Sequence, residues 1–364
     1  MDLTRRSLLK TGAGAAAAGT VAGCLDDIDP ADQELDAGYA AFFTLWDWAE
    51  TVSGDAIAFE DPVGAGQAGH GWSPSGDLTR EIADAGAFVY LDTPEFSWAQ
   101  DIAATLEADY DTVTVINGLE GLDDQLLGWG HEVDAGGHDG DDGHGHDGED
   151  GNESGHDGDD GHGHDGEDGN ESGHDGHTHD QSSVDPHVWL DPVIAQDIVD
   201  TIASGLADAD PDNAETYEEN ADAYTSDLDS LDQQFQDVID GADRQVAVFA
   251  GHDSFTYLQE RYGFELHTPA GVSPQEQITS EQIAETIDLV DAEGIDTILY
   301  NPFIAPDGSY QLVENILEGS NATDTMPITH LSGTLATWRD DGWGYREQME
   351  EINLPALREV LDAQ

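Results

Sequence analysis

The middle of the chain contains a long stretch without internal glycine or proline, PDNAETYEENADAYTSDLDSLDQQFQDVI (Pro211–Ile239). Its large apolar residues recur at helical spacing: Tyr217, Tyr224, Leu228, Leu231 and Phe235. This periodicity, kept over so many positions, predicts one long, stiff helix with one buried face. A second helical segment, Val193–Ala207, precedes it. We therefore expect residues 193–240 to connect the two parts of the chain on either side.

Those two parts alternate between short strands and helices. Runs rich in β-branched or aromatic residues predict strands at Tyr39–Leu45, Ala56–Glu60, Ala87–Leu91 and Thr112–Ile116 before the connecting helices, and at Gln245–Ala250, Phe264–His267, Thr297–Tyr300 and Met326–Thr329 after them. Helical patterns separate the strands, and Gly344–Leu361 is expected to be the last helix. The alternation predicts an α/β fold with two lobes of parallel sheet flanked by helices, residues 37–192 and 241–364, joined by the long rigid helix.

A glycine- and acid-rich segment, residues 137–180, contains no lysine, arginine, aliphatic or aromatic residue. Its first 18 letters, GHDGDDGHGHDGEDGNES, are repeated without change at 155–172. Nine of the 15 histidines of the chain lie in it: His138, His144, His146, His156, His162, His164, His174, His177 and His179. Imidazoles beside carboxylates suit a borderline-soft divalent cation such as zinc. Because nothing in the segment can build a core, we expect a disordered loop with weak, auxiliary metal sites.

The chain carries 80 Asp and Glu against 9 Lys and Arg, a formal net charge of -71. The acidic residues are spread over every segment rather than gathered in blocks. This pattern is typical of a protein that works in very high salt, because salt screens the self-repulsion. Beyond the first 24 residues only six arginines remain, too few for a phosphate-binding face, so the composition excludes nucleic acid as a partner.

The first 24 residues have the features of an export signal. TRRSLLK (Thr4–Lys10) is typical of twin-arginine export, and an uncharged run rich in alanine and glycine follows it, too short to span a membrane. The run ends at VAGC, where the only cysteine of the chain, Cys24, occupies the position at which a lipoprotein is acylated. We expect residues 25–36 to be an acidic spacer and lipidated Cys24 to anchor an exported protein to the outer face of the cytoplasmic membrane.

Four histidines outside the loop stand where an α/β fold binds ligands. His252 and His330 follow two of the predicted strands directly, His70 follows a third across a glycine-rich turn, and His187 lies in a proline-flanked turn before the connecting helices. Ligands of open α/β sheets bind beyond the carboxyl ends of the strands, so these imidazoles can converge on one ion. Four nitrogen ligands, or three with a carboxylate or water, suit tetrahedral Zn²⁺.

Several motifs resemble the metal-binding receptors of ABC transporters, in the zinc (ZnuA-type) and manganese branch, over residues 39–361. The most specific is DPHVWLDP (Asp185–Pro192). Further blocks match at FFTLWDWA (42–49), GHGWSPS (69–75), FAGHDSF (249–255), GVSPQE (271–276) and the final helix. The acidic, histidine-rich insert before DPHVWLDP is typical of the zinc branch. The chain is similar to a lipoprotein form of this receptor from a haloarchaeon.

The resemblance implies a ligand set and a role. By it, His70, His187 and His252 are the first three metal ligands, and His330 stands where the manganese members have an aspartate. Gly69 replaces the proline that usually precedes the first ligand. A monomeric receptor would capture Zn²⁺ in a cleft between the lobes and deliver it to a membrane permease driven by an ATPase. Zinc is expected rather than Mn²⁺, because manganese prefers carboxylate oxygens.

Other functions stay open at this point. A manganese-specific receptor, a surface metal store or an adhesin would use the same fold and anchor. A zinc hydrolase is disfavoured, because the chain has neither a His-Glu-x-x-His nor a Gly-x-Ser-x-Gly motif, and we expect no enzyme. For the histidine-rich loop, the hypothesis is a weak collector that passes zinc to the rigid site, and the alternative is a sensor or chelator that occludes it.

Overall fold

The computed structural model describes residues 35–67, 69, 72–128, 184–270, 278–303 and 310–364. Four parallel strands from the first part of the chain form a sheet in the order β2-β1-β3-β4. They are β1 (Ala37–Ala40), β2 (Ala58–Glu60), β3 (Ala87–Tyr90) and β4 (Thr114–Asn117). β3 is buried along its whole length. Such continuous burial is expected of a central strand whose sheet is covered on both faces.

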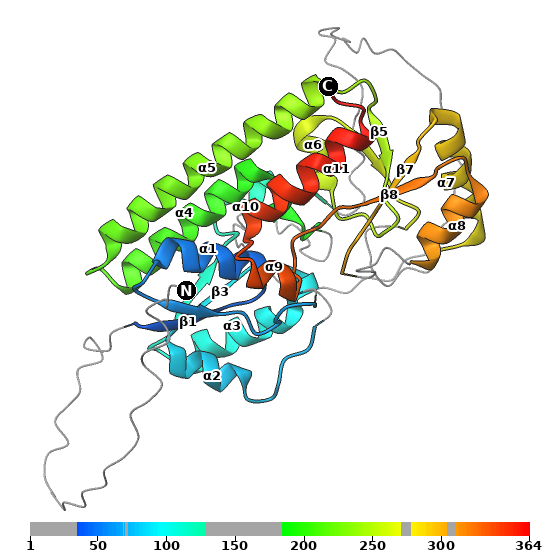
Figure 1. Ribbon diagram of the computed structural model, residues 1–364. Helices are drawn as coiled ribbons and strands as arrows, with labels where there is room; N and C mark the ends of the chain where they lie inside the picture. Colours follow the sequence, from blue (N-terminus) through cyan, green and yellow to red (C-terminus); the bar gives the residue numbers. More distant parts are fainter. Residues whose placement is uncertain (1–34, 68, 70–71, 129–183, 271–277, 304–309) are drawn as a thin grey trace, which may run out of the picture. The chain divides into compact units, whose positions relative to one another are not determined.

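Helices cover both faces of this first sheet. α2 (Leu78–Ala85) and α3 (Ser97–Asp109) pack on one face, and α1 (Phe43–Ser53) and α4 (Pro192–Ala209) pack on the other (Figure 1). The first strand is shorter than the sequence predicts, because the chain turns into α1 at Phe43 instead of continuing to Leu45. Phe42, Phe43, Thr44 and Leu45 are all buried, and an unbroken buried run does not distinguish strand from helix.

The second part of the chain contributes four more parallel strands. β5 (Val246–Val248) pairs with β6 (Glu265–His267), and β7 (Thr297–Tyr300) pairs with β8 (Asp324–Pro327). A parallel bridge between Phe249 and Leu299 joins the two pairs. α6 (Thr256–Tyr262), α7 (Ser280–Glu293) and α8 (Gln311–Gly319) alternate with these strands, and a second, smaller apolar cluster lies between α7, α8 and the strands. The predicted α/β class with parallel sheets flanked by helices is confirmed.

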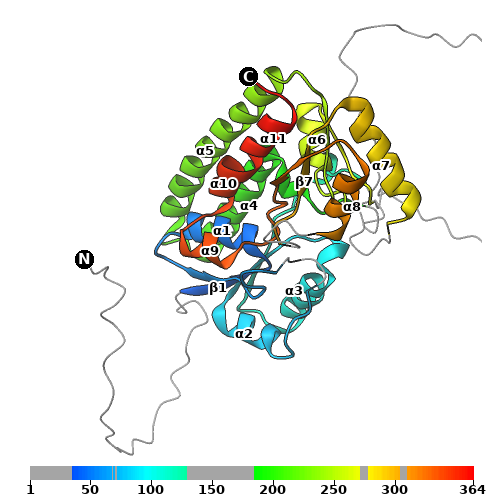
Figure 2. The same ribbon diagram turned by 45° about the vertical axis from the view of Figure 1, so that its right-hand side comes forward.

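The long helix expected in the middle of the chain is α5 (Ala214–Asp240), of 27 residues. All five apolar residues that predicted it are buried. α4 and α5 lie side by side in both ribbon views (Figures 1 and 2). α5 also contacts α1 from the first part of the chain and α6 from the second. One helix therefore packs against helices that flank both sheets.

The final helix is interrupted by a π-helical turn, whereas a single helix is expected from the sequence over Gly344–Leu361. After a short α9 (Ala336–Asp340), which the sequence analysis missed, α10 (Tyr345–Gln348) runs into a π-helical turn, η7 (Met349–Asn353), and then into α11 (Leu354–Val360). Pro355 explains the interruption. It has no N–H to donate to the preceding turn, and its ring crowds the carbonyl four residues earlier.

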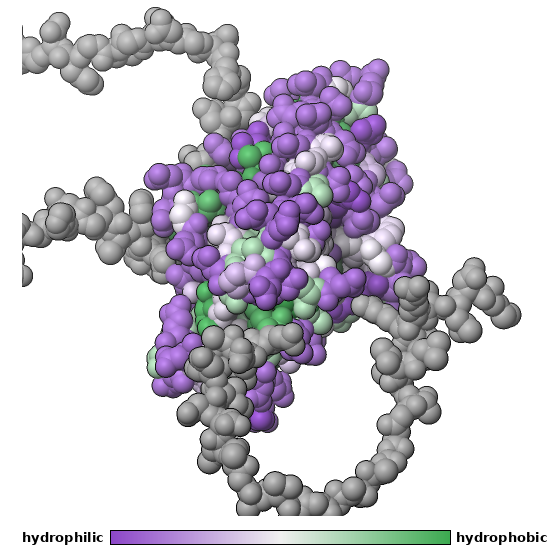
Figure 3. Space-filling view, turned by 90° about the vertical axis from the view of Figure 1, so that its left-hand side faces the viewer, coloured by the Kyte–Doolittle hydropathy of each residue, from purple (hydrophilic) through white to green (hydrophobic). Residues whose placement is uncertain are grey.

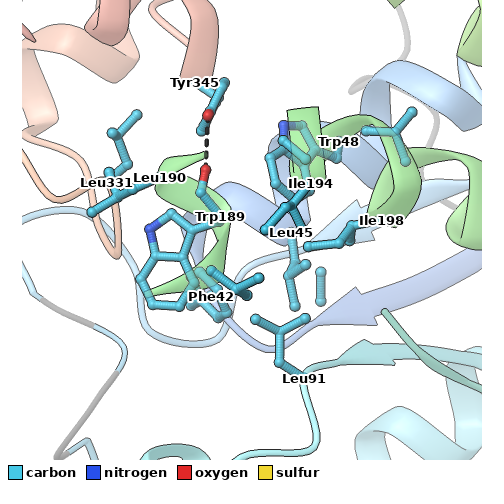
Figure 4. Packing of buried hydrophobic residues seen from close by; sticks show 14 of the residues in the cluster. Phe42, Leu45, Trp48, Leu91, Trp189, Leu190, Ile194, Ile198, Leu331 and Tyr345 are labelled. Atoms are coloured by element: carbon cyan, nitrogen blue, oxygen red, sulfur yellow. Dashed lines mark hydrogen bonds between the residues drawn. The ribbon is translucent and has the colours of Figure 1, made fainter. Parts of the chain in front are cut away.

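The main core centres on Trp189, in the short helix η6 (Val188–Leu190). Its ring lies 4.8 Å from the Phe42 ring, and its carbonyl accepts a 2.7 Å hydrogen bond from the Tyr345 hydroxyl (Figure 4). Residues from distant parts of the sequence therefore meet in one apolar cluster. The surface differs from this apolar core. The face seen in Figure 3 is mostly hydrophilic, as expected from the acidic composition. No helix in the described part of the chain is long and apolar enough to cross a bilayer.

Replacing Arg261 with Met is expected to destabilise the fold by about 1–3 kcal/mol. The guanidinium binds Asp191 through Nε and a terminal nitrogen, both at 2.7 Å, while the Asp191 side chain is 4 % exposed and caps α4. Burial raises the pKa of Asp191 and the Arg261 charge lowers it, so removing the arginine leaves a buried carboxylate without its cation. The effect stays below that of a fully buried pair because the Arg261 side chain is 33 % exposed.

Urea unfolding at a fixed, high salt concentration measures this effect. Arg80→Met is the matched control, because Arg80 is 63 % exposed and its ion pairs with Asp77 at 3.5 Å and Asp84 at 3.7 Å lie at the surface. We expect a change below about 0.5 kcal/mol for the control. Equal unfolding free energies for the two variants would contradict the role assigned to Arg261.

Candidate metal centre

His187 is held by the turn that contains it. The residue precedes η6 and is buried. Asp185, two positions earlier, accepts hydrogen bonds at the same carboxylate oxygen from the His187 backbone N–H at 2.9 Å and from Nδ1 at 2.8 Å. The imidazole also lies edge-on to the Trp189 ring, with the centroids 5.4 Å apart. The DPHVW sequence therefore fixes both the backbone and the ring of His187.

Asp185 is buried and remains ionised. Burial by itself would raise the pKa of its carboxyl group, but the charge and the two hydrogen bonds of His187, with the Thr256 hydroxyl, outweigh burial and hold the pKa below its ordinary value. The Asp185 backbone is fixed as well, because its N–H donates to Leu127 and its carbonyl accepts from the Tyr257 hydroxyl. A charged acceptor is thus locked behind the His187 ring.

His252 follows the first strand of the second sheet. Beyond β5, the backbone makes a tight turn in which the Gly251 N–H donates to the Phe249 carbonyl at 2.9 Å. A Cβ atom at position 251 would lie 2.5 Å from the Phe249 ring, so only glycine fits directly before His252. The His252 side chain is buried, and its ring centroid lies 5.5 Å from that of His187.

His330 follows the last strand and is fixed by the first part of the chain. Its carbonyl accepts a 2.7 Å hydrogen bond from the Trp189 indole N–H. The next residue, Leu331, is buried with φ of 56°, and its carbonyl accepts a 2.6 Å bond from the Thr44 hydroxyl. Ser332 places its hydroxyl 2.8 Å from His330 Nδ1. A left-handed conformation at a leucine is unusual, and such strain concentrates at functional sites.

The three imidazoles gather in one place. The ring centroids are 5.5 Å apart for His187 and His252, 5.7 Å for His252 and His330, and 6.3 Å for His187 and His330. Around a tetrahedral Zn²⁺ with Zn–N distances of about 2.0 Å, ring centroids would be roughly 5.2 Å apart. Within the described residues, no three His, Cys, Asp or Glu side chains are already arranged to hold a metal ion. A contraction of about 1 Å or less brings these three rings to zinc spacing.

His70, the first of the predicted ligands along the chain, lies outside the described residues, but its neighbour Gly69 is described. The Gly69 N–H donates to the Ser332 carbonyl at 3.2 Å, two residues beyond His330. A Cβ atom at position 69 would meet Phe42 at 2.7 Å and Phe96 at 2.9 Å. A proline there could neither donate this hydrogen bond nor fit this space. Gly69, the residue directly before His70, is thus hydrogen-bonded to the segment that carries His330.

Two further carboxylates lie close to the imidazoles. Burial raises the pKa of Asp253 to about 6, with the Asp185 charge raising it and His187 lowering it. Burial also raises the pKa of Glu95. The Asp185 charge raises this pKa further, and His187 lowers it. Together with ionised Asp185, these groups give the centre a negative environment that favours a cation.

One other histidine, His267, lies in the described part of the chain. His267 ends β6, and its Nε2 lies 2.9 Å from the Thr286 hydroxyl, which fits a structural role. Its burial lowers its pKa. The nine histidines of the loop, residues 138–179, lie outside the described residues, as does Cys24.

Sequence reasoning missed the residues that hold the imidazoles. Asp185 was part of the quoted DPHVWLDP motif, and its spacing of two from His187 is the signal that would have assigned it. The contacts of Trp189 and Thr44 with the His330 segment left no such signal, because they join residues 141 and 287 positions apart.

The chain matches the family described as "ZnuA: Zinc-uptake complex component A periplasmic" over residues 39–359, and it belongs to that family. Zinc-binding lipoprotein AdcA of Streptococcus pneumoniae (strain ATCC BAA-255 / R6) is 27 % identical over 322 residues, 88 % of this chain and 55 % of the relative. High-affinity zinc uptake system protein ZnuA of Bacillus subtilis (strain 168) is 29 % identical over 179 residues, 49 % of this chain and 54 % of the relative.

Solved structures agree with the fold. The Zn(II)-bound ZnuA-like domain of Streptococcus pneumoniae AdcA aligns with a TM-score of 0.64 and 24 % identity, over 91 % of this chain and all of that domain. The metal-dependent lipoprotein YcdH of Bacillus subtilis aligns with a TM-score of 0.65 and 21 % identity, over 90 % of this chain and 99 % of the other. The chain spans about half the length of the curated relatives it matches.

Proposed function

We propose that this protein is the extracytoplasmic zinc receptor of an ABC transporter. It captures Zn²⁺ and delivers it to a membrane permease driven by a cytoplasmic ATPase. The observation that carries the proposal is the gathering of three buried imidazoles, His187, His252 and His330, from three separate turns of the fold. The family description and the names of the relatives, zinc-binding and zinc-uptake proteins, support the same conclusion.

The proposed ligands are His187, His252, His330 and His70. In His187, the hydrogen bond between Nδ1 and Asp185 supports Nε2 as the atom that binds the metal, the arrangement usual for zinc-bound histidines. Three or four imidazoles without a thiol favour zinc over manganese, which prefers oxygen ligands. The contact from Gly69 to Ser332 supports the inclusion of His70.

The motifs in the first 24 residues support a setting for the receptor. We propose export by the twin-arginine route, attachment of a lipid at Cys24 and function as a monomer in high salt. The relative from Streptococcus pneumoniae is itself named a lipoprotein. The histidine-rich loop would collect zinc weakly ahead of the rigid centre. α5 packs against α1 beside the first sheet and α6 beside the second. We therefore propose that release involves small movements of the ligands rather than wide opening of the fold.

Zinc titration of the intact mature protein in multi-molar salt tests the proposal. It predicts one tight zinc site per chain, which a manganese salt does not occupy at comparable concentrations. A tight site selective for manganese would contradict the assignment of the metal, and the lack of any tight site would contradict the receptor function.

Replacing Asp185 with Asn is expected to weaken zinc binding about 10- to 100-fold. The amide is nearly the same size as the carboxylate but removes the charge that holds the His187 ring and its tautomer. Asp288→Asn is the control, because it removes the same charge from an exposed position on α7. Competition titrations with a chelator at fixed pH and salt measure the affinities. If the two variants bind zinc equally well, Asp185 has no such role.

A further inference from the structure

The π-helical turn before Pro355 places one polar side chain inside the protein. The Leu354 N–H donates to the Met349 carbonyl, five residues earlier, and Pro355 has no N–H with which to restore the ordinary pattern. Asn353, the last residue of the turn, is fully buried. π-Helical turns are rare and occur frequently at functional sites.

Both ends of the Asn353 carboxamide bind the same residue. The Thr329 N–H donates to Asn353 Oδ1 at 2.8 Å, and Asn353 Nδ2 donates to the Thr329 carbonyl at 2.8 Å. Asn353 Nδ2 also donates to the sulfur of Met349, and these two atoms are 3.3 Å apart. The side chain thus pairs with a backbone residue as a neighbouring β-strand would, at the point just beyond the end of β8 at Pro327.

Asparagine is an unfavourable choice at this position unless these bonds matter. It is a poor helix former, and burial of its amide is costly without full hydrogen bonding. Its neighbours Leu354, Ala356 and Leu357 are buried apolar residues, and another apolar residue would fill the same space without that cost. What Asn353 adds is control over the backbone of Thr329.

Thr329 directly precedes His330. On the other side of His330, the carbonyl groups of His330 and Leu331 are held by Trp189 and Thr44. Asn353 therefore completes a set of hydrogen bonds that fixes the backbone before and after the imidazole. The strained Leu331, with φ of 56°, keeps its conformation only while both sides are held.

We propose that Asn353 is a positioning residue for His330, and that the π-helical turn serves to present it to Thr329. The proposal rests on the proposed function, because it matters only if His330 binds the metal. Asn353 does not contact zinc. It sets the place of the His330 imidazole relative to His187 and His252, so that these imidazoles can close around the ion.

Asn353→Ala in the intact mature protein tests this proposal, with zinc affinity and the visible spectrum of the Co²⁺-loaded protein as readouts. We expect zinc binding to weaken about 10- to 100-fold and the Co²⁺ bands of a tetrahedral site to lose intensity. Leu357→Ala is the matched control. It opens a cavity in the same helix and leaves both hydrogen bonds between Asn353 and Thr329 in place, and we expect its affinity and Co²⁺ spectrum to match the wild type. Asn353→Ser, which keeps one hydrogen-bonding group, replaces the alanine variant if that variant does not fold, and an intermediate loss is expected.

A double variant with His330→Ala separates the two proposals. If Asn353 acts through His330, Asn353→Ala costs less than about twofold once His330 is absent. Wild-type affinity and spectrum in Asn353→Ala or its serine substitute, with a large loss in His330→Ala, would overturn the role of Asn353 and leave the receptor function standing. Unchanged zinc binding in His330→Ala would overturn both the ligand assignment and the role of Asn353.

Discussion

Replacing His187 with Ala is expected to remove tight zinc binding, with a loss of more than about 100-fold in affinity, beyond the range of outer-shell changes. His187 is one of the three gathered imidazoles, and its turn holds it through Asp185. Asp185 binds both the backbone and the ring of His187. The centroid of the His187 ring lies 5.5 Å from that of His252 and 6.3 Å from that of His330. Without His187, the remaining ligands cannot complete a tetrahedron except with water, and the ordered negative charge of Asp185 no longer faces a ligand.

His267→Ala is the matched control for this loss. It also removes a partly buried imidazole at a strand end, but His267 contacts Thr286 and none of the gathered rings. Calorimetric titration with zinc in multi-molar salt compares the two. If the tight site survives in His187→Ala, or is lost equally in His267→Ala, the three-histidine centre is wrong.

Replacing Asp47 with Asn is expected to change how stability depends on pH, by up to about 3 kcal/mol. Asp47, on α1, is partly buried and accepts hydrogen bonds from the Tyr345 backbone N–H at 2.9 Å and from the Tyr224 hydroxyl at 3.5 Å. Burial raises its pKa from 3.8 to about 6, against the lowering effect of these donors. The folded state therefore binds this proton more tightly than the unfolded state does.

The sign of the effect follows from that shift. The contribution of Asp47 to stability is complete below pH 3.8 and is lost as the pH rises through about 6. Asparagine stays neutral and keeps an oxygen for both donors, so Asp47→Asn gains stability relative to the wild type between these pH values and keeps the gain at neutral pH. Urea unfolding at pH 4 and pH 7 measures it. Asp222→Asn, at an exposed position on α5, controls for the loss of one negative charge. A constant difference between Asp47→Asn and wild type at the two pH values would contradict the prediction.

The sequence predicted the fold where local patterns act alone. The apolar period of residues 217–235 predicted α5, and β7 was placed at its observed residues, because both are marked by periodicity or by turn residues at their ends. The errors fall where tertiary packing decides. Phe43 begins a helix within an apolar run that also reads as a strand, and Pro355 lies inside an otherwise helical pattern and produces a π-helical turn.

For the candidate centre too, the sequence predicted what local patterns decide and missed what tertiary packing decides. The positions of His252 and His330 after strands follow from the alternation of elements, and the structure brings both beside His187. The residues that hold them, Asn353 and Thr44 among others, lie far away along the chain and are recognisable only once the fold is known. The spacing of Asp185 and His187 is the exception, since both belong to one turn.

X-ray absorption spectroscopy of the intact mature protein, loaded with one zinc ion in multi-molar salt, tests the central claim most directly. Our account predicts a zinc shell of low coordination number with three or four imidazole nitrogens at about 2.0 Å and no sulfur. The multiple-scattering features of the imidazole rings should weaken in His187→Ala. A six-coordinate shell of oxygen atoms, unchanged in His187→Ala, would mean that the gathered histidines are not the zinc site.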